Sequence, residues 1–195
     1  VSLNDSDNVY GANDPAINFT IKLYKNSSIV YAYFSSIESV TNGSQTIINH
    51  GDNFYTINYT ILSPGTDNHT NITIYAFDAS DNVTTNFSFD VKIDDQNPLI
   101  SEQEKTPFIA FNIDNLFLNG TIDDNFGLKQ ILITSDHSGI FVNYSSLTNV
   151  NNKYSFRLNS SSLSNGQTIK WKYVAIDKAN NVNEGSLITT RLNNR

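Results

Sequence analysis

The sequence repeats itself at an offset of 99 residues, which constrains the fold more than any other feature. The stretch 76–83 reads Ala-Phe-Asp-Ala-Ser-Asp-Asn-Val, and the stretch 175–182 reads Ala-Ile-Asp-Lys-Ala-Asn-Asn-Val. The same offset superimposes, without a gap, 17–23 on 116–122 and 55–59 on 154–158. Self-similarity at a fixed period predicts copies of one structural module in tandem.

The length of the chain fits two modules of ordinary domain size. The 195 residues are 38% hydrophobic and 12% aromatic, which excludes a disordered tail. The run 94–98, Asp-Asp-Gln-Asn-Pro, breaks the pattern between the copies and is short and stiffened by proline. We therefore expect domain 1 at residues 1–94 and domain 2 at residues 95–195.

Apolar and polar residues alternate along most of each copy. Ile17, Phe19 and Ile21, for example, are separated by polar residues, as a half-buried strand requires. No segment of convincing length shows the period of an amphipathic helix. The predicted strands are a short one at 1–3, then 17–23, 29–34, 55–61, 70–77 and 87–93, and in the second copy 115–122, 128–135, 154–159, 168–176 and 185–192. Short strands at this spacing predict a β-sandwich with Greek-key connections.

A strand, then Ala-x-Asp-x-x-x-Asn, then a strand resembles the closing hairpin of bacterial and archaeal Ig-like repeat domains of cell-surface (S-layer or adhesin-type) proteins. Those repeats commonly carry Gly where this chain has Asp81 and Asn180. Asp and Asn tolerate a left-handed backbone better than other non-glycine residues, so the turn can keep its shape. The resemblance implies an all-β fold of two tandem Ig-like Greek-key β-sandwich domains and an extracellular location, but no particular ligand.

The acidic residues of this motif have a structural interpretation. Asp78 and Asp177 can accept hydrogen bonds from backbone amides of their own turns, and Asn82 and Asn181 close the same motif. We expect these four residues to hold the closing hairpin of each sandwich.

Charge and composition exclude several classes of function. The net charge is −7, with 12 basic and 19 acidic residues, so binding to nucleic acid or anionic lipid is disfavoured. No run approaches the roughly 18 apolar residues of a membrane helix, so we expect no membrane insertion in this segment. The chain starts at Val1 without Met or a signal-like segment, and we expect a processed protein or an excised segment. It has no Cys, so disulfides do not stabilise it.

Asn-x-Ser/Thr glycosylation sequons occur twice as often as chance predicts. With 29 Asn and 39 Ser plus Thr, chance gives roughly six, against twelve observed. They lie at Asn4, Asn18, Asn26, Asn42, Asn58, Asn68, Asn71, Asn82, Asn86, Asn119, Asn143 and Asn159. Two interpretations stay open: several sites carry N-glycans, or alternation on the outer face of strands produces the pattern by itself.

Two acidic clusters suggest calcium at the boundary between the copies. Asp94, Asp95 and Asn97 loosely resemble the linker of cadherin-like repeats, where oxygen ligands hold the cation. A second cluster, Asp123 and Asp124, follows a predicted strand. The alternative is that these residues form Asx turns that end the strands.

Enzymatic chemistry finds little support in the sequence. His50, His69 and His137 fall in different polar stretches that we interpret as solvated loops, and no Ser lies in a Gly-x-Ser-x-Gly elbow. Trp171 and Tyr173 alternate in a predicted strand, and we expect them to pack the core. We therefore expect a protein that is not an enzyme.

The leading hypothesis is a structural and interaction module of a prokaryotic, more specifically archaeal, cell-surface protein: an S-layer, stalk or adhesin segment. Its partners would be neighbouring copies, other surface proteins or glycans. One alternative is a filament subunit that donates a strand from 1–3 or 186–192 to a neighbour. Another is a carbohydrate-binding module of a secreted enzyme, for which Tyr10, Phe126 and Phe141 poorly meet the need for exposed aromatics.

Overall fold

The computed structural model divides the chain into two compact units. Unit 1 comprises Val1–Gln96 with Lys178–Asn181, and unit 2 comprises Asn97–Asp177 with Val182–Arg195. Each unit is described by itself below, and the domain bounds expected from the sequence stay a prediction. The structure describes residues 2–3, 9–11, 17–23, 29–33, 44–60, 68–77, 80, 83–106, 115–159, 163–164 and 166–192.

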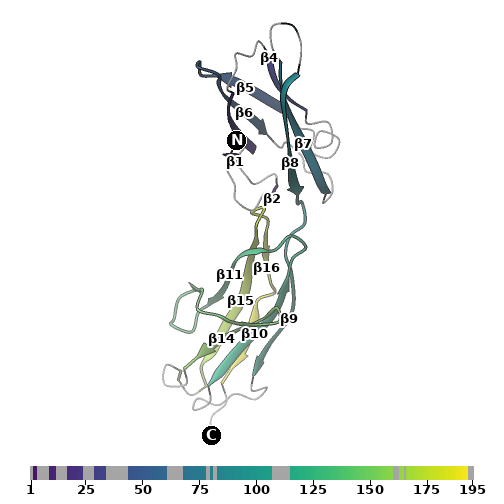
Figure 1. Cartoon of the computed structure of the whole chain (residues 1–195). Coiled ribbons are helices and arrows are strands. Elements are labelled where there is room, and N and C mark those ends of the chain that lie inside the picture. The colour runs from purple at the N-terminus through teal and green to yellow at the C-terminus, as the bar shows by residue number, and fades with distance from the viewer. Residues whose placement is uncertain are drawn as a thin grey trace. The chain divides into compact units, whose positions relative to one another are not determined.

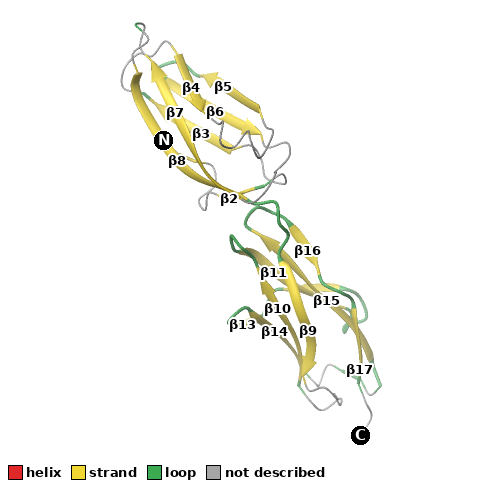
Figure 2. Cartoon of the chain, turned by 90° about the vertical axis from the view of Figure 1, so that its right-hand side faces the viewer, coloured by secondary structure: helices red, strands yellow, loops and turns green. Residues whose placement is uncertain are grey.

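Within these residues the protein consists of strands, turns and loops without a helix (Figure 2). Unit 1 contains two four-stranded sheets (Figure 1). The first has the order β1 (Ser2–Leu3), β3 (Ile17–Lys22), β6 (Phe54–Thr60), β5 (Ser44–Asn49). The second has the order β2 (Val9–Tyr10), β8 (Val83–Ile93), β7 (Asn68–Phe77), β4 (Ile29–Tyr33).

Unit 2 is also built from two sheets. One has the order β13 (Thr148–Val150), β14 (Lys153–Leu158), β10 (Leu116–Asp123), β9 (Leu99–Thr106). The other has the order β12 (Val142–Tyr144), β11 (Leu128–Ser135), β15 (Thr168–Asp177), β16 (Val182–Glu184), with β17 (Ile188–Arg191) also paired to β15.

The strand order is that of an Ig-like Greek-key sandwich. In unit 2, β10 pairs with β14 in one sheet while the intervening β11 and β12 belong to the other sheet. In unit 1, β1 pairs antiparallel with β3, and β2 then joins the opposite sheet by parallel pairing with β8. The expected all-β Ig-like fold is confirmed.

The core of each unit lies between its sheets, because alternate residues of the inner strands point inward. In unit 1 the buried set includes Ile17, Phe19, Ile21, Ile57, Tyr59 and Ile74. In unit 2 it includes Leu116, Leu118, Ile133, Ile169, Trp171 and Tyr173. Trp171 and Tyr173 are fully buried, so their expected role in core packing is confirmed.

The two cores fill one inter-sheet position differently. Tyr173 crosses unit 2, and its hydroxyl contacts the carbonyl oxygens of Leu118 at 2.8 Å and Tyr154 at 2.9 Å. A Cβ added to Gly120 would lie 2.7 Å from the Tyr173 ring. At the positions 99 residues earlier, unit 1 has Ile21 and Ile74, both buried. Tyr173 and Gly120 in unit 2 thus stand where unit 1 has two isoleucines, and this exchange of one large and one small residue for two of medium size conserves core volume.

The strand predicted at 185–192 is shorter in the structure, where β17 spans Ile188–Arg191. Gln103 of β9 inserts its carboxamide just before β17: Oε1 accepts from Tyr173 N at 3.1 Å, and Nε2 donates to Ser186 O at 3.3 Å. A Cβ on Gly185 would lie 2.3 Å from Oε1 of Gln103, so a larger residue at position 185 would require the Gln103 side chain to move. β16 and β17 therefore flank a break at 185–187. The sequence did not predict β9, whose only apolar residues are Leu99 and Ile100.

Candidate functional sites

The acidic loop after β10 forms hydrogen-bonded turns in unit 2. Asp124 Oδ1 accepts from Phe126 N at 3.0 Å and Gly127 N at 2.7 Å. Asp123 Oδ1 accepts from Asp124 N at 2.9 Å and Asn152 Nδ2 at 3.2 Å. Backbone N–H groups that donate to a nearby Asp side chain are the hydrogen bonds expected of Asx turns.

A second carboxylate approaches this loop within unit 2. Asp177, at the end of β15, is fully buried, and a carboxylate oxygen of Asp177 lies within 4.8 Å of one of Asp124. Two carboxylates this close repel each other, and Ca²⁺ is a cation that prefers such oxygen ligands. Sequence reasoning assigned Asp177 to a turn alone. The signal that it missed is strand pairing, because Leu128 at the start of β11 is opposite Asp177.

The other predicted metal ligands lie around residue 95. Asp94 in unit 1 is fully buried, its N–H donates to Tyr10 O at 3.0 Å, and its Oδ1 accepts from Gln96 N at 3.1 Å. Asp95 is half-buried. Asn97, which belongs to unit 2, is exposed.

Part of the repeated motif is visible in the second copy. Asn180 adopts the left-handed backbone expected from the sequence, with φ of 61°. Asn181 is 6% exposed, and its Nδ2 donates to Asp94 O at 3.2 Å and Gln96 O at 3.1 Å, within unit 1. Asn181 thus satisfies two backbone carbonyls, while backbone acceptance by Asp177 stays a prediction. Asp78 and Asn82 of the first copy lie outside the described residues.

The glycosylation candidates differ in exposure. Asn143 on β12 and Asn159 after β14 are exposed, whereas Asn18, Asn58 and Asn119 are half-buried on strands. Asn18 and Asn58 are opposite each other on β3 and β6, and the Oδ1 of Asn58 is buried without a hydrogen-bond partner in the described part of the chain. Asn68 and Asn71 lie on β7 and Asn86 on β8, whose side chains there are not described. The described residues do not include Asn4, Asn26, Asn42 and Asn82.

The histidines do not all lie in solvated loops. His50 is exposed next to β5, but His69 lies within β7. His137 is half-buried, with its ring 5.0 Å from that of Tyr144 and 6.2 Å from that of Phe156. Burial lowers the pKa of His137, and the neighbouring Asp136 charge partly opposes this shift. The prediction of a loop was wrong for His69, which pairs in a strand, and the prediction of a solvated side chain was wrong for His137, against which aromatic rings pack.

His137 also contacts a serine, which is the pairing of a hydrolytic nucleophile. Its Nδ1 lies 3.3 Å from Ser135 Oγ, and its backbone N–H donates to the same oxygen at 3.4 Å. Ser135 is fully buried on β11, so a substrate cannot reach its hydroxyl. The pair is local turn chemistry between residues i and i+2.

The aromatic residues considered for carbohydrate binding do not form a platform. Tyr10 is only 1% exposed in the core of unit 1, and Phe126 is half-buried. Phe141 is 51% exposed. The segments considered for strand donation lie in sheets of the chain itself: Ser2–Leu3 pairs with β3, and Ile188–Arg191 pairs with β15.

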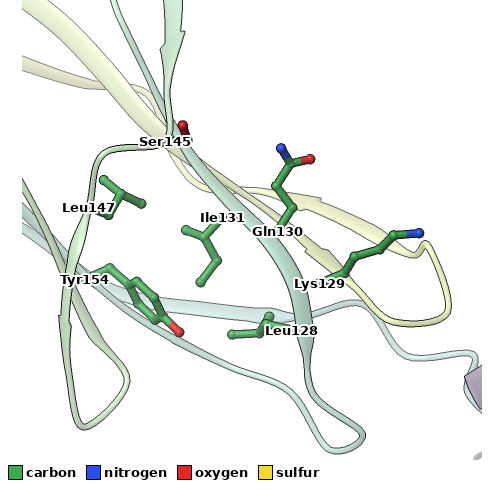
Figure 3. Close-up of a pocket in the computed structure, with 7 residues that line it drawn as sticks. All are labelled: Leu128, Lys129, Gln130, Ile131, Ser145, Leu147 and Tyr154. Carbon is green, nitrogen blue, oxygen red and sulfur yellow. The ribbon is translucent and has the colours of Figure 1, made fainter. Parts of the chain in front are cut away.

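A pocket of about 250 Å³ opens on the side of unit 2, between β11, the loop after β12, and β14 (Figure 3). Leu128, Ile131, Leu147 and Tyr154 converge on it, whereas Lys129 and Gln130 extend away on the other side of β11 (Figure 3). Lys129, Gln130 and Ser145 also line it, and polar atoms contribute more of its exposed surface than apolar ones.

No protein-family model and no curated protein matches the chain, but solved structures match its fold. A three-Ig fragment of titin matches with a TM-score of 0.53 and 15% identity, over 95% of this chain and 62% of the titin chain. The chain therefore spans less than two thirds of that fragment. Described residues contain no helix long and apolar enough to cross a membrane.

Bacterial proteins are also among the structural neighbours. Fibronectin(III)-like modules of Clostridium thermocellum CbhA match with a TM-score of 0.46 and 13% identity, over 99% of this chain and 94% of theirs. A Ca²⁺-stabilised adhesin with which an Antarctic bacterium binds ice matches with a TM-score of 0.49 and 11% identity, over 97% of this chain and 47% of its own. At these identities the likeness concerns the fold, and the titin match alone exceeds a TM-score of 0.5 among the three. The chain is an all-β protein with the fold of Ig-like β-sandwich domains.

Proposed function

We propose that the chain is a structural and interaction module of an extracellular cell-surface protein, without enzymatic activity. This proposal rests on a combination of two features: both units have a filled Ig-like core, and their outer sheet faces are polar but mostly uncharged. On unit 1, for example, the outer positions of β3 and β6 include Asn18, Thr20, Thr56 and Asn58, with the pair Lys22 and Phe54 at one end. Such faces keep a tandem of sandwiches soluble and limit edge-to-edge aggregation.

The finer parts of the proposal concern origin and partners. We assign the module to an archaeal S-layer, stalk or adhesin, with domain bounds at 1–94 and 95–195. Its partners are neighbouring copies, other surface proteins or surface glycans. The 99-residue repeat supports a stalk, since modules that recur in tandem extend a chain by simple addition.

Surface location is tested on intact cells of the producing organism. Antibodies against the recombinant chain should label unpermeabilised cells, and brief external proteolysis should remove the label while a cytoplasmic marker stays intact. Labelling that requires permeabilisation would refute the proposal.

Glycosylation belongs to the same proposal and has its own test. Asn143 and Asn159 are exposed, so they should carry glycans in natively produced protein, and Asn119, half-buried on β10, should carry less. Peptide mass spectrometry measures occupancy at each sequon, with recombinant bacterial protein as the unmodified reference. Bare peptides at both exposed sites would contradict this part of the proposal.

Calcium is the cofactor that the acidic residues fit. Within unit 2, the carboxylates of Asp124 and Asp177 lie close enough to share one cation. The ion would hold this end of the sandwich together by neutralising two like charges.

A further inference from the structure

One edge of unit 1 is a regular strand that is paired on one side only. β5 (Ser44–Asn49) is the outermost strand of its sheet, and no described strand pairs with its other side (Figure 2). All six of its residues pair with β6 without a shift in register. The strand contains neither a charged residue nor Pro. A straight, uncharged outer strand is a template on which another strand can pair.

Most other outer strands of the described chain are protected from such pairing. β1 and β2 contain two residues each, and β12, β13 and β16 contain three. β9 is longer, but it carries Glu102, Glu104 and Lys105, and a bulge with Glu102 at a φ of 49° interrupts its register. Short length, charge and bulges are devices by which natural proteins keep sheet edges apart. β5 is the longest outer strand that lacks all three.

The backbone groups of β5 alternate between β6 and the open side. His50 N, directly after β5, donates to Phe54 O at 2.9 Å, in the register that relates β5 to β6. Antiparallel pairs alternate between hydrogen-bonded and non-hydrogen-bonded ones, so the even-numbered residues of β5 bond to β6. The N–H and C=O groups of Gln45, Ile47 and Asn49 therefore point away from β6, toward the open side.

A second copy of β5 is complementary to this edge. When Ile47 lies opposite Ile47 of the other copy, Gln45 lies opposite Asn49, so one carboxamide meets another. Asn49 Oδ1 already accepts from Gly51 N at 2.9 Å, which leaves the Asn49 amide group to donate to Gln45. In this register three residue pairs each exchange two N–H···O bonds, which gives six backbone hydrogen bonds between the copies.

The side chains along this edge allow two acidic copies to approach each other. The chain has a net charge of −7, but β5 and β6 contain no charged residue, so like charges do not meet over the paired stretch. Thr46 lies opposite Ile48 of the other copy, and β-branched residues are favoured on such strands. Ile48 is 42% exposed in one copy and would be covered. A charged peptide would find no opposite charge on this edge, whereas the same neutral strand needs none.

We infer that β5 of one copy of this chain pairs antiparallel with β5 of a second copy, about a two-fold axis at Ile47. The pairing joins two four-stranded sheets into one continuous sheet. Both copies use the same surface, so the contact is isologous and closes at a dimer. The inference deepens the proposed function and rests on it in taking neighbouring copies as partners. The dimer forms in solution wherever the chain resides, so the cell-labelling experiment can fail independently of it.

Sedimentation velocity on the full chain over a range of concentrations tests the inference. The wild type should convert from monomer to dimer as its concentration rises, without larger species. Gln45→Pro removes one outward N–H from each copy, and the loss of two hydrogen bonds should raise the Kd of the dimer by about tenfold or more. Pro is tolerated on an outer strand where the N–H faces solvent, so the fold should survive. Gln45→Ala keeps the N–H and should weaken the dimer less.

A charge on the same edge provides a second variant. Ile48→Lys places one positive charge on each copy beside the two-fold axis and should also raise the Kd by about tenfold or more. Val150→Lys is the matched control, since Val150 is 69% exposed on β13 of unit 2 and its replacement should leave the Kd unchanged. Far-ultraviolet circular dichroism identifies the variants that stay folded.

Disulfide trapping tests the register, because the chain has no Cys of its own. In the inferred register Thr46 and Ile48 of the other copy form a non-hydrogen-bonded pair, with Cα atoms about 4.5 Å apart. This distance suits a disulfide, so a mixture of Thr46→Cys and Ile48→Cys should crosslink under mild oxidation. Either variant alone places its two Cys residues about 7 to 8 Å apart and should crosslink far more slowly.

Three results would each overturn the inference. A wild type that stays monomeric at every concentration would leave the edge to a strand of another protein. Dimers that Gln45→Pro and Ile48→Lys leave unchanged would place the contact elsewhere on the chain. Single Cys variants that crosslink as fast as their mixture would exclude the register centred on Ile47.

Discussion

Replacing Gly120 with Ala should destabilise unit 2, although the reverse is expected at an unhindered strand position. The new Cβ would lie 2.7 Å from Cδ2 and Cε2 of Tyr173, about 1 Å inside ordinary carbon contact. The ring cannot simply retreat, because its hydroxyl contacts Leu118 O and Tyr154 O and it packs edge-on against Trp171.

Overpacking of this kind costs about 1 to 3 kcal/mol. An unstrained Gly→Ala change would instead stabilise the protein by about 0.4 to 1 kcal/mol through the unfolded chain. The two expectations differ in sign, which makes the experiment decisive. For a unit of about 100 residues, the predicted loss corresponds to a Tm that is lower by roughly 5 to 20 °C.

Urea unfolding followed by tryptophan fluorescence provides the assay. Trp171 is the single Trp of the chain and lies in the core of unit 2 beside Tyr173, so the signal reports that unit. A double-mutant cycle with Tyr173→Ile, which introduces the residue type found at the corresponding position of unit 1, isolates the clash. In that background Gly120→Ala should cost nothing measurable.

Gly139→Ala is the matched control, because no atom lies within 4 Å of its added Cβ. Its φ of 95° makes Ala strained, and this cost should be the same in the wild type and in the Tyr173→Ile background. The reasoning fails if Gly120→Ala leaves the urea midpoint unchanged or raises it, or if the cost of Gly120→Ala is equal in both backgrounds.

Three further predictions concern other contacts. Burial lowers the pKa of His137, so the unfolded state takes up a proton at a higher pH than the folded state does. The free energy of unfolding should therefore fall as pH drops below about 6.5. His137→Gln should flatten the pH dependence of urea unfolding between pH 7 and 5.5, and parallel curves for wild type and variant would refute this. Gln103→Ala removes the partner of Tyr173 N and should lower the free energy of unfolding by about 1 to 3 kcal/mol, whereas Ala at the exposed neighbour Glu104 should have little effect. Calcium at 100 times its Kd should stabilise the protein by about 2.7 kcal/mol and so raise its Tm. Chelator should reverse this rise, and the variant Asp124→Asn/Asp177→Asn should not show it. A Tm that changes with neither calcium nor chelator would exclude the site.

The sequence by itself determined the repeated unit, most strands and the composition of both cores. Alternation along 17–22 and 55–60 is a local property with a period of two residues, so it identifies a strand and its buried face without knowledge of its neighbours. The burial of Trp171 and Tyr173 and the left-handed backbone of Asn180 follow from the same local rules.

Only the tertiary structure decided which distant residues meet. β9 is mostly polar and becomes a strand because it pairs with β10, and its Gln103 bonds to Ser186 at the start of the strand predicted at 185–192, which begins only at Ile188. The approach of Asp177 to Asp124 and the convergence of Leu128, Leu147 and Tyr154 on one pocket depend on strand register. Register is a relation between segments, fixed by packing across the sheet, so no single stretch of sequence contains it.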